Sequence, residues 1–257
     1  MEESFGQLEE QAKQATTIEE LFCLWKRAHA AEVKEGNWEK TCQFKEKDKG
    51  KKHHFDPQKA AKENFTKDGR LGNAQKGGVL FICKESNLSR DEDTDKKLSE
   101  NEEACVKAFW LREEVVLNQP SICDPSQMKI VKSAKTHYRN CLEKTLSELS
   151  KKGYPAPKNL EDCAYMNLNK RGGNSTCNKT VLAAYIKKYK TFLQREIELL
   201  QCDVAVLYSA SIYGKKAMKM IEQIFRGAGV KTVVKINCHP SRYSNQKIEN
   251  MEITKNP

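Results

Sequence analysis

The amino-acid sequence predicts a three-layer α/β/α domain with a four-stranded, mainly parallel sheet, preceded by a helical N-terminal extension. Short apolar runs alternate with long amphipathic segments, and this alternation is typical of parallel strands joined by crossover helices. The length of 257 residues is enough for one such domain with its own hydrophobic core. The balance of 38% apolar and 31% charged residues excludes collagen-like and wholly disordered chains.

The first 76 residues are predicted to form helices and a lysine-rich connection outside the sheet. Residues 5–35 have a helical pattern, with Thr17 as a candidate N-cap. The polar stretch that follows is rich in lysine, and a short helix is expected in it near 57–64. We therefore place a boundary between the extension, residues 1–76, and the α/β domain, residues 77–257.

Four short apolar runs are the candidate strands, and a parallel sheet would bury each of them on both faces. They lie at 77–84, 163–169, 203–209 and 232–237. Helical patterns are found at Glu102–Val116, Met128–Leu149, Thr180–Leu200 and Gly214–Arg226. Ligands of such sheets bind beyond the carboxyl ends of the strands, so the residues after each run are the candidate site.

The excess of positive charge lies in the C-terminal part of the chain. The net charge is +10, and residues 151–257 carry 19 basic and 8 acidic side chains. A field of one sign attracts polyanions, which favours nucleic acid as a partner. No run of eighteen apolar residues occurs and the N-terminus is acidic, so we expect a cytoplasmic protein without membrane contact. The ten cysteines include no C-x-x-C pair, which favours reduced thiols.

Polar and titratable side chains are concentrated directly after the four candidate strands. The segments are Lys84–Ser89, Asn167–Asn174, Tyr208–Ser211 and Asn237–Arg242. Together they contain a glutamate, a histidine, asparagines, hydroxyls and cations. A loop needs polar residues, but it does not need this mixture of hydrogen-bonding and titratable groups. The sequence therefore predicts a ligand site at the carboxyl ends of the strands.

These segments resemble the motifs of the uracil-DNA glycosylase superfamily. His239-Pro240-Ser241 follows the last strand like the family's final motif, and CAYMNLNKRGGN (163–174) resembles the stretch that holds its base-reading asparagine. Residues 192–211 resemble the helix and strand before the final motif. The resemblance spans about residues 77–245. It implies the fold of that family, DNA as the partner, and hydrolysis of the N-glycosidic bond of a flipped base.

The resemblance also implies three roles at the site. His239 would donate a hydrogen bond to the departing base, and Asn167 would contact the Watson–Crick edge of the flipped base. Glu85 would position the water or stabilise the sugar cation.

The first motif departs from the family pattern. Relatives have Gly-Gln-Asp-Pro-Tyr, Gly-Glu-Ala-Pro-Gly or Gly-x-Asn-Pro-Gly there, and this chain has Lys84-Glu85-Ser86-Asn87-Leu88. Ser86 stands where the first version has its water-activating aspartate, so Ser86 or Asn87 is an alternative to Glu85. Lys84 replaces a glycine, and we therefore expect a pocket shaped for something other than plain uracil. The expected base-binding set is Asn167, Asn169, Asn87 and Ser86.

A second group of residues is expected to contact the DNA outside the base pocket. Hydroxyls and cations after the strands can bind phosphates, and a side chain after the His-Pro-Ser motif can fill the space left by the flipped base. The expected DNA-contacting residues are Lys84, Lys170, Arg171, Ser209, Ser211, Ser241, Arg242 and Tyr243.

We therefore expect a monomeric, monofunctional DNA glycosylase that removes uracil or another modified or damaged base from double- or single-stranded DNA. Repair and defence against modified phage DNA are the contexts considered. No cofactor or metal is expected, because the C-x-x-C pair of the iron–sulfur relatives is absent. The alternative is a non-catalytic nucleic-acid-binding module on the same fold that senses a base. An unrelated hydrolase or nucleotide-binding enzyme is disfavoured, because the chain has neither G-x-S-x-G nor a P-loop.

Overall fold

The computed structural model describes residues 3–43, 56–63, 65, 69–70, 76–87, 137–173, 177–240 and 245–256. For residues 84–87 and 172–173 it describes the backbone. The expected helix at 102–116 lies outside the described residues, as does the first part of the one expected at 128–149.

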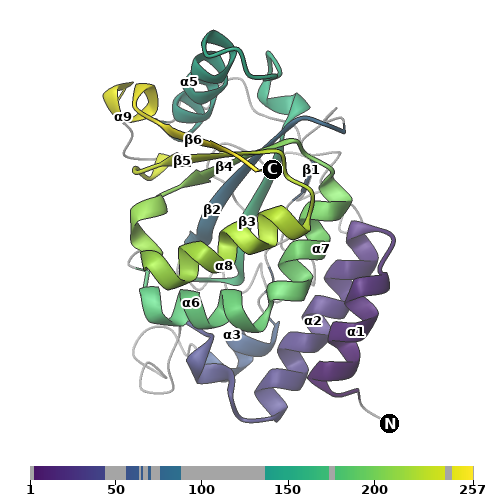
Figure 1. The fold of residues 1–257 in the computed structure, drawn as a ribbon. Helices are drawn as coiled ribbons and strands as arrows, with labels where there is room; N and C mark the ends of the chain where they lie inside the picture. Colours follow the sequence, from purple (N-terminus) through teal and green to yellow (C-terminus); the bar gives the residue numbers. More distant parts are fainter. Residues whose placement is uncertain are drawn as a thin grey trace, which may run out of the picture.

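The described chain contains a six-stranded sheet with the order β1-β3-β2-β4-β5-β6 (Figure 1). The four central strands are parallel to one another, and each overlaps one of the four predicted runs; they are β2 (Val79–Asn87), β3 (Ala164–Gly173), β4 (Val204–Tyr208) and β5 (Thr232–Ile236). β2 and β3 extend beyond the predicted runs at their carboxyl ends. The prediction of a mainly parallel sheet flanked by helices is thus confirmed. The strand count of four is wrong, because β1 (Gly69–Arg70) and β6 (Glu252–Lys255) pair antiparallel at the two edges. Both are short and polar, so they give no apolar run in the sequence.

Helices lie on both faces of this sheet (Figure 1). The long ones are α1 (Phe5–Gln14), α2 (Ile18–Lys34), α5 (His137–Lys151), α6 (Lys179–Lys188), α7 (Lys190–Leu200) and α8 (Gly214–Gly227). The short ones are α3 (Pro57–Glu63) and α9 (Asn245–Glu249), and single 3-10 turns occur at Trp38–Lys40, Leu160–Asp162 and Ala210–Ile212. The single helix expected at 180–200 is two helices that meet at Tyr189. The sequence did not predict the break, because the apolar spacing continues through it.

Each face of the sheet has its own hydrophobic core. Leu80 and Ile82 of β2 pack with α1, α2, α6, α7 and α8, whereas Phe81 and Cys83 pack with α5 and α9 on the opposite face. This alternation along a strand that is buried on both sides explains its continuous apolar sequence. No helix in the described part of the chain is long and apolar enough to cross a membrane.

The N-terminal helices share the core of the first face. α1 begins at a capping box formed by Ser4 and Gln7, and Thr17 caps α2 as predicted by accepting a hydrogen bond from the Glu20 amide. α1 and α2 both pack against α7. Trp25 of α2 is fully buried in this core, with its ring centroid 5.3 Å from that of Phe192.

The substitution Trp25→Ala should destabilise the whole domain by about 3–5 kcal/mol, because it removes a large buried ring and leaves a cavity. The measurement is denaturant-induced unfolding followed by circular dichroism. Cys23→Ala, at an exposed position on the same helix, is the control and should change the free energy of unfolding by less than about 0.5 kcal/mol. A loss that is confined to the N-terminal helices, with the sheet unfolding as before, would contradict a shared core.

Candidate functional site

The carboxyl ends of β3, β2, β4 and β5 lie together at one end of the sheet, because the four strands are parallel neighbours. We call this end of the strands the sheet edge, which is distinct from the outer strands β1 and β6. Cys83 of β2 is in register with Asn167 of β3, and Glu85 is in register with Asn169. Neighbouring strands lie about 4.8 Å apart. The backbone therefore brings the glutamate and asparagine positions of two separate motifs side by side.

The ends of β4 and β5 are held together by a backbone hydrogen bond. The amide of Ser209 donates to the carbonyl of Cys238 over 3.0 Å. Within the turn that follows β4, the Ile212 amide donates to the Ser209 carbonyl over 2.9 Å. Ser209 has a φ of 56°, which is uncommon for a residue other than glycine. His239 follows Cys238 and is half-buried. It stands two strands from Glu85, a backbone separation of roughly 10 Å at the usual strand spacing.

The two asparagines of the site are inside the protein. Asn167 is 1% exposed and Asn169 is completely buried. The side-chain carbonyl of Asn169 accepts a hydrogen bond from the Arg171 amide over 3.1 Å. This local bond to the backbone two residues further on fixes which way the amide group of Asn169 points.

Glu85, Ser86 and Asn87 were expected in a loop after the strand that ends at Lys84, but their backbone continues strand β2. Pairing with β3 persists to Asn87. Regular pairing from Glu85 and Asn169 would place Asn87 opposite Arg171, but its partner is Gly173. Two extra residues of β3 are therefore accommodated in a bulge between Asn169 and Gly173. The sequence placed the strand end too early because its apolar residues stop before its backbone pairing does.

Ser209 and Ser211 lie on the same edge, after β4. Ser209 is buried, whereas Ser211 is exposed in the turn before α8. The remaining predicted DNA contacts, Ser241, Arg242 and Tyr243, lie outside the described residues.

Lys170 and Arg171 are completely buried, and the prediction that they contact DNA phosphates is wrong. The Lys170 ammonium lies 2.7 Å from Oε1 of Glu196 in α7, and 5.4 Å from the centroid of the Trp25 ring. A cation that is enclosed by a carboxylate and aromatic rings is not available to a ligand at the surface. The sequence placed it at the surface because a lysine is seldom buried unless it is paired.

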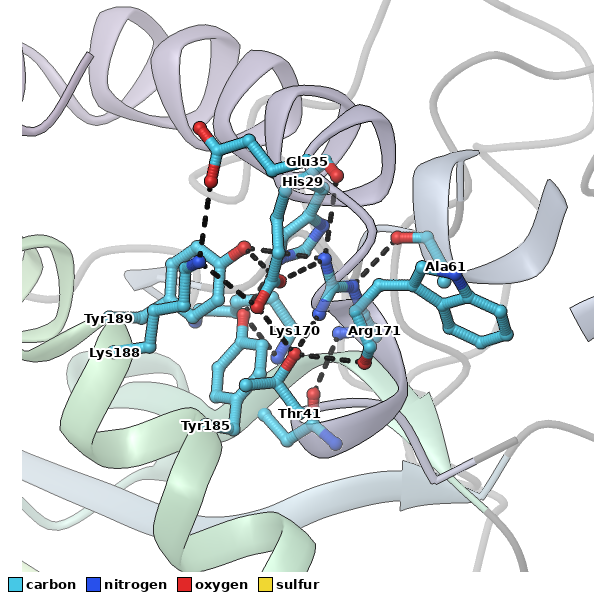
Figure 2. A network of polar contacts seen from close by, with 12 residues as sticks. His29, Glu35, Thr41, Ala61, Lys170, Arg171, Tyr185, Lys188 and Tyr189 are labelled. Carbon is cyan, nitrogen blue, oxygen red and sulfur yellow. Dashed lines mark hydrogen bonds and ion pairs between the residues drawn. The ribbon is translucent and has the colours of Figure 1, made fainter. Parts of the chain in front are cut away.

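Arg171 is the centre of a buried polar network that joins four segments of the chain (Figure 2). Its Nη2 lies 2.6 Å from Oε2 of Glu32 in α2, and its Nη1 donates to the Thr41 hydroxyl over 2.8 Å. Its Nε donates to the Ala61 carbonyl of α3 over 2.7 Å, and Nη2 lies 3.3 Å from the Tyr189 hydroxyl. The guanidinium fork thus meets acceptors from α2, α3, the turn at Thr41 and the α6–α7 junction.

The network keeps Glu32 ionised in the interior. Burial alone would raise the pKa of this carboxyl, but the Arg171 guanidinium, a hydrogen bond from Tyr189 and Lys188 together hold it below its usual value. The Tyr189 hydroxyl donates to Glu32 over 2.8 Å, and burial raises the pKa of Tyr189 itself well above its usual value. At neutral pH the network therefore contains a carboxylate, a guanidinium and neutral tyrosines.

Buried thiols lie beside the same sheet edge, on the α5 face. Cys141 of α5 packs in one cluster with Cys83 and Cys238, which directly precede Lys84 and His239. A hydrogen bond with Cys238, together with burial, raises the pKa of the Cys141 thiol. It is therefore a thiol rather than a nucleophilic thiolate at neutral pH. Within the described residues, no group of histidine, cysteine and acidic side chains is arranged to hold a metal ion.

Three exposed lysines in the first two turns of α8 were not identified as candidate site residues from the sequence. Lys215, Lys216 and Lys219 lie seven to eleven residues after the end of β4 at Tyr208, and none forms an ion pair with the described residues. Their signal in the sequence was Lys215-Lys216 at the start of the helical pattern that follows the third candidate strand. We call these three lysines the α8 cations.

A cavity of about 630 Å³ lies between α1, α2 and α3. Cations and acids both line it, among them Arg27, Lys34, Lys62 and Glu63. None of its lining residues belongs to the set predicted from the strand ends.

Comparison with protein-family models, with curated proteins and with solved structures finds no match for this chain.

The substitution Glu32→Gln should destabilise the protein at pH 7 by about 3–5 kcal/mol, because it leaves the Arg171 charge buried without its carboxylate. The pH dependence should also change. The pKa of Glu32 is lowered by folding, so its contribution is present above the usual value of 4.5 and is lost as the pH falls through the folded value. The variant should therefore lose less stability than the native protein between pH 7 and pH 3, as measured by urea unfolding at each pH.

Glu35→Gln is the matched control, because Glu35 is 41% exposed and lies 3.9 Å from Lys188. It should leave both the stability and its pH profile nearly unchanged. Equal effects of the two substitutions would show that the buried pair contributes nothing beyond a surface charge.

Proposed function

We propose that this protein is a DNA glycosylase of the uracil-DNA glycosylase type, which hydrolyses the N-glycosidic bond of uracil or another modified base. The proposal assigns the site to the sheet edge where the four parallel strands end. The observation that carries it is the pairing of Glu85 with Asn169 on adjacent strands, at the same edge as His239. Three motifs that resemble those of one enzyme family thus come from strands that end side by side.

The chemistry of the reaction assigns a role to each group. The base leaves the DNA stack first, at a cost of a few kcal/mol. As the bond between C1′ and the base breaks, the sugar becomes an oxocarbenium-like cation and the base gains negative charge. His239 donates a hydrogen bond to the base oxygen or nitrogen that becomes negative, while Asn167 contacts the base edge through its amide. Glu85 stabilises the sugar cation or orients the water whose oxygen bonds to C1′, and the proton that this water loses neutralises the departed base.

The charge distribution supports DNA as the substrate. Residues 151–257 carry the excess of positive charge, and the α8 cations are exposed at the carboxyl side of β4. Lys215 and Lys216 lie in the first turn of α8, where a cation is unfavourable next to the positive end of the helix dipole. A phosphate close to these residues would offset that repulsion and would be attracted by the backbone amides of the same turn. We therefore assign the α8 cations the phosphate contacts that Lys170 and Arg171 do not make.

The experiment that tests the function is incubation of the protein with duplexes that each carry one modified base, followed by chromatography of the released bases. We expect free base and an alkali-labile abasic site from at least one duplex. His239→Ala should slow the single-turnover reaction by a factor that corresponds to the loss of about 2–4 kcal/mol of transition-state stabilisation. DNA affinity should be retained, because phosphate contacts supply most of that affinity.

Glu85→Gln is the companion variant, because it keeps the shape of the side chain and removes its charge. Full activity of this variant would exclude the carboxylate and move its role to Ser86 or Asn87. Tight binding to a modified duplex with no base release from any substrate would reject the enzyme and favour a module that only senses a base.

Replacing the three α8 cations with glutamine should reduce the slope of log K against log salt by about 2–3, because each phosphate contact contributes roughly 0.9. Fluorescence anisotropy of a labelled duplex at several salt concentrations gives this slope. The control replaces Lys151, Lys152 and Lys158, which are exposed near the start of β3 at the opposite edge of the sheet. This control variant loses the same charge and should keep most of the native slope of log K against log salt. An equal reduction of the slope in the two triple variants would show that net charge, not a defined face, attracts the DNA.

A further inference from the structure

The bulge at the end of β3 is held from inside the protein, by the side chains that were expected to lie outside it. Between Asn169 and Gly173 the strand departs from its regular pairing with β2. Lys170 and Arg171 begin this bulge, and both of their side chains end in fully buried ion pairs. The Lys170 amide also faces the Tyr185 hydroxyl at 3.3 Å, and the Arg171 amide donates to Asn169.

We propose that Arg171 is a positioning residue, which is anchored by Glu32 of α2 and fixes the β3 bulge and the amide orientation of Asn169 at the candidate site. The link is short: the guanidinium of Arg171 binds Glu32, while the backbone amide of the same residue donates to the side-chain carbonyl of Asn169. The inference rests on the proposed function for its consequence in catalysis, but not for its geometry. It gives the N-terminal helices a role, since α2 supplies the anchor.

Amide orientation matters because the two ends of an asparagine side chain have opposite hydrogen-bonding character. A reversed Asn169 amide would present an acceptor where it now presents a donor. With its carbonyl engaged by the Arg171 amide, the group is held in one orientation. An asparagine that is held in this way can distinguish one base edge from another, whereas one that rotates freely accepts both.

The nature of the anchor also favours a positioning role over simple stabilisation. A buried ion pair recovers little more than the desolvation penalty of its two charges, and an apolar pair of similar volume is often as stable. What an arginine adds is a rigid fork with a defined direction. The contacts of this fork reach four separate segments, which are represented by Glu32, Thr41, Ala61 and Tyr189. Because these contacts come from four directions in the fold, they fix the position of the β3 backbone at Arg171.

The test compares Glu32→Gln with Glu196→Gln. Both substitutions break one fully buried ion pair to adjacent residues of the same bulge, but only the first removes the anchor of Arg171. The readouts are the side-chain amide resonances of Asn169 in a ¹⁵N spectrum, assigned with Asn169→Asp, and hydrogen exchange of the Arg171 amide. Glu32→Gln should shift or broaden the Asn169 resonances and speed exchange of the Arg171 amide by about tenfold or more. Glu196→Gln should leave both close to the native values.

If Glu32→Gln does not fold, Thr41→Val takes its place, because it removes a hydroxyl that contacts both charges and keeps the ion pair. Arg171→Lys serves as the conservative variant and should restore part of the exchange protection that Arg171→Met loses. Equal changes at Asn169 in the Glu32 and Glu196 variants, or none in either, would overturn the positioning role.

Catalysis adds a separate arm. On a duplex that the native protein cleaves, Glu32→Gln should reduce kcat and base selectivity more than Glu196→Gln does at a temperature where both are folded. If the native protein releases no base, the proposed function fails, and the resonance and exchange measurements still decide the positioning role.

Discussion

The buried contact between Arg171 and Glu32 joins the two parts of this fold. Arg171 stands at the end of a central strand, and Glu32 stands on a helix near the N-terminus. A guanidinium in the interior needs an acceptor for each of its donors, so it can be buried only when α2, α3 and the turn at Thr41 are all in place. The end of β3 and the N-terminal helices must therefore form together.

The same requirement shapes the sheet edge. Because the side chains of Lys170 and Arg171 turn into the core, β3 bulges after Asn169 and then pairs again with β2. The bulge falls where Glu85 and Asn169 are adjacent and where the next two strands are joined by the bond between Ser209 and Cys238. Bulges are common beside active sites, where they direct a side chain. A buried ionic network thus lies directly below the polar edge to which we assign the chemistry.

The central strands could be predicted from the sequence because burial on both faces leaves a continuous apolar run, as in Val79–Cys83. The edge strands could not, since Gly69–Arg70 and Glu252–Lys255 pair through their backbones and have little apolar sequence. The expectation that Asn167 and Glu85 lie toward one end of the sheet followed from the rule that parallel strands end together, and in the structure the pairing of β2 with β3 makes their motifs adjacent.

The surroundings of Lys170 and Arg171 could not be predicted from local sequence, because their partners Glu196 and Glu32 come from other elements. One signal was present in α2. Glu32 continues the apolar stripe of Leu21, Trp25 and Ala28 at helical spacing, and a carboxylate in such a stripe requires a buried partner. The basic residues after β3 were the candidates for it. The lysines of α8 are visible in the sequence, but their exposure is known only from the structure.

The proposed site is tested most directly by a crystal structure of the protein bound to a duplex with a non-hydrolysable deoxyuridine analogue. We expect the analogue to be flipped out of the duplex, with its base at the carboxyl ends of β3, β2, β4 and β5. His239 should lie within hydrogen-bond distance of the base, and the DNA backbone should follow the start of α8. A base that remains stacked in the duplex, or DNA bound at the cavity between α1, α2 and α3, would contradict the assignment of this edge as the active site.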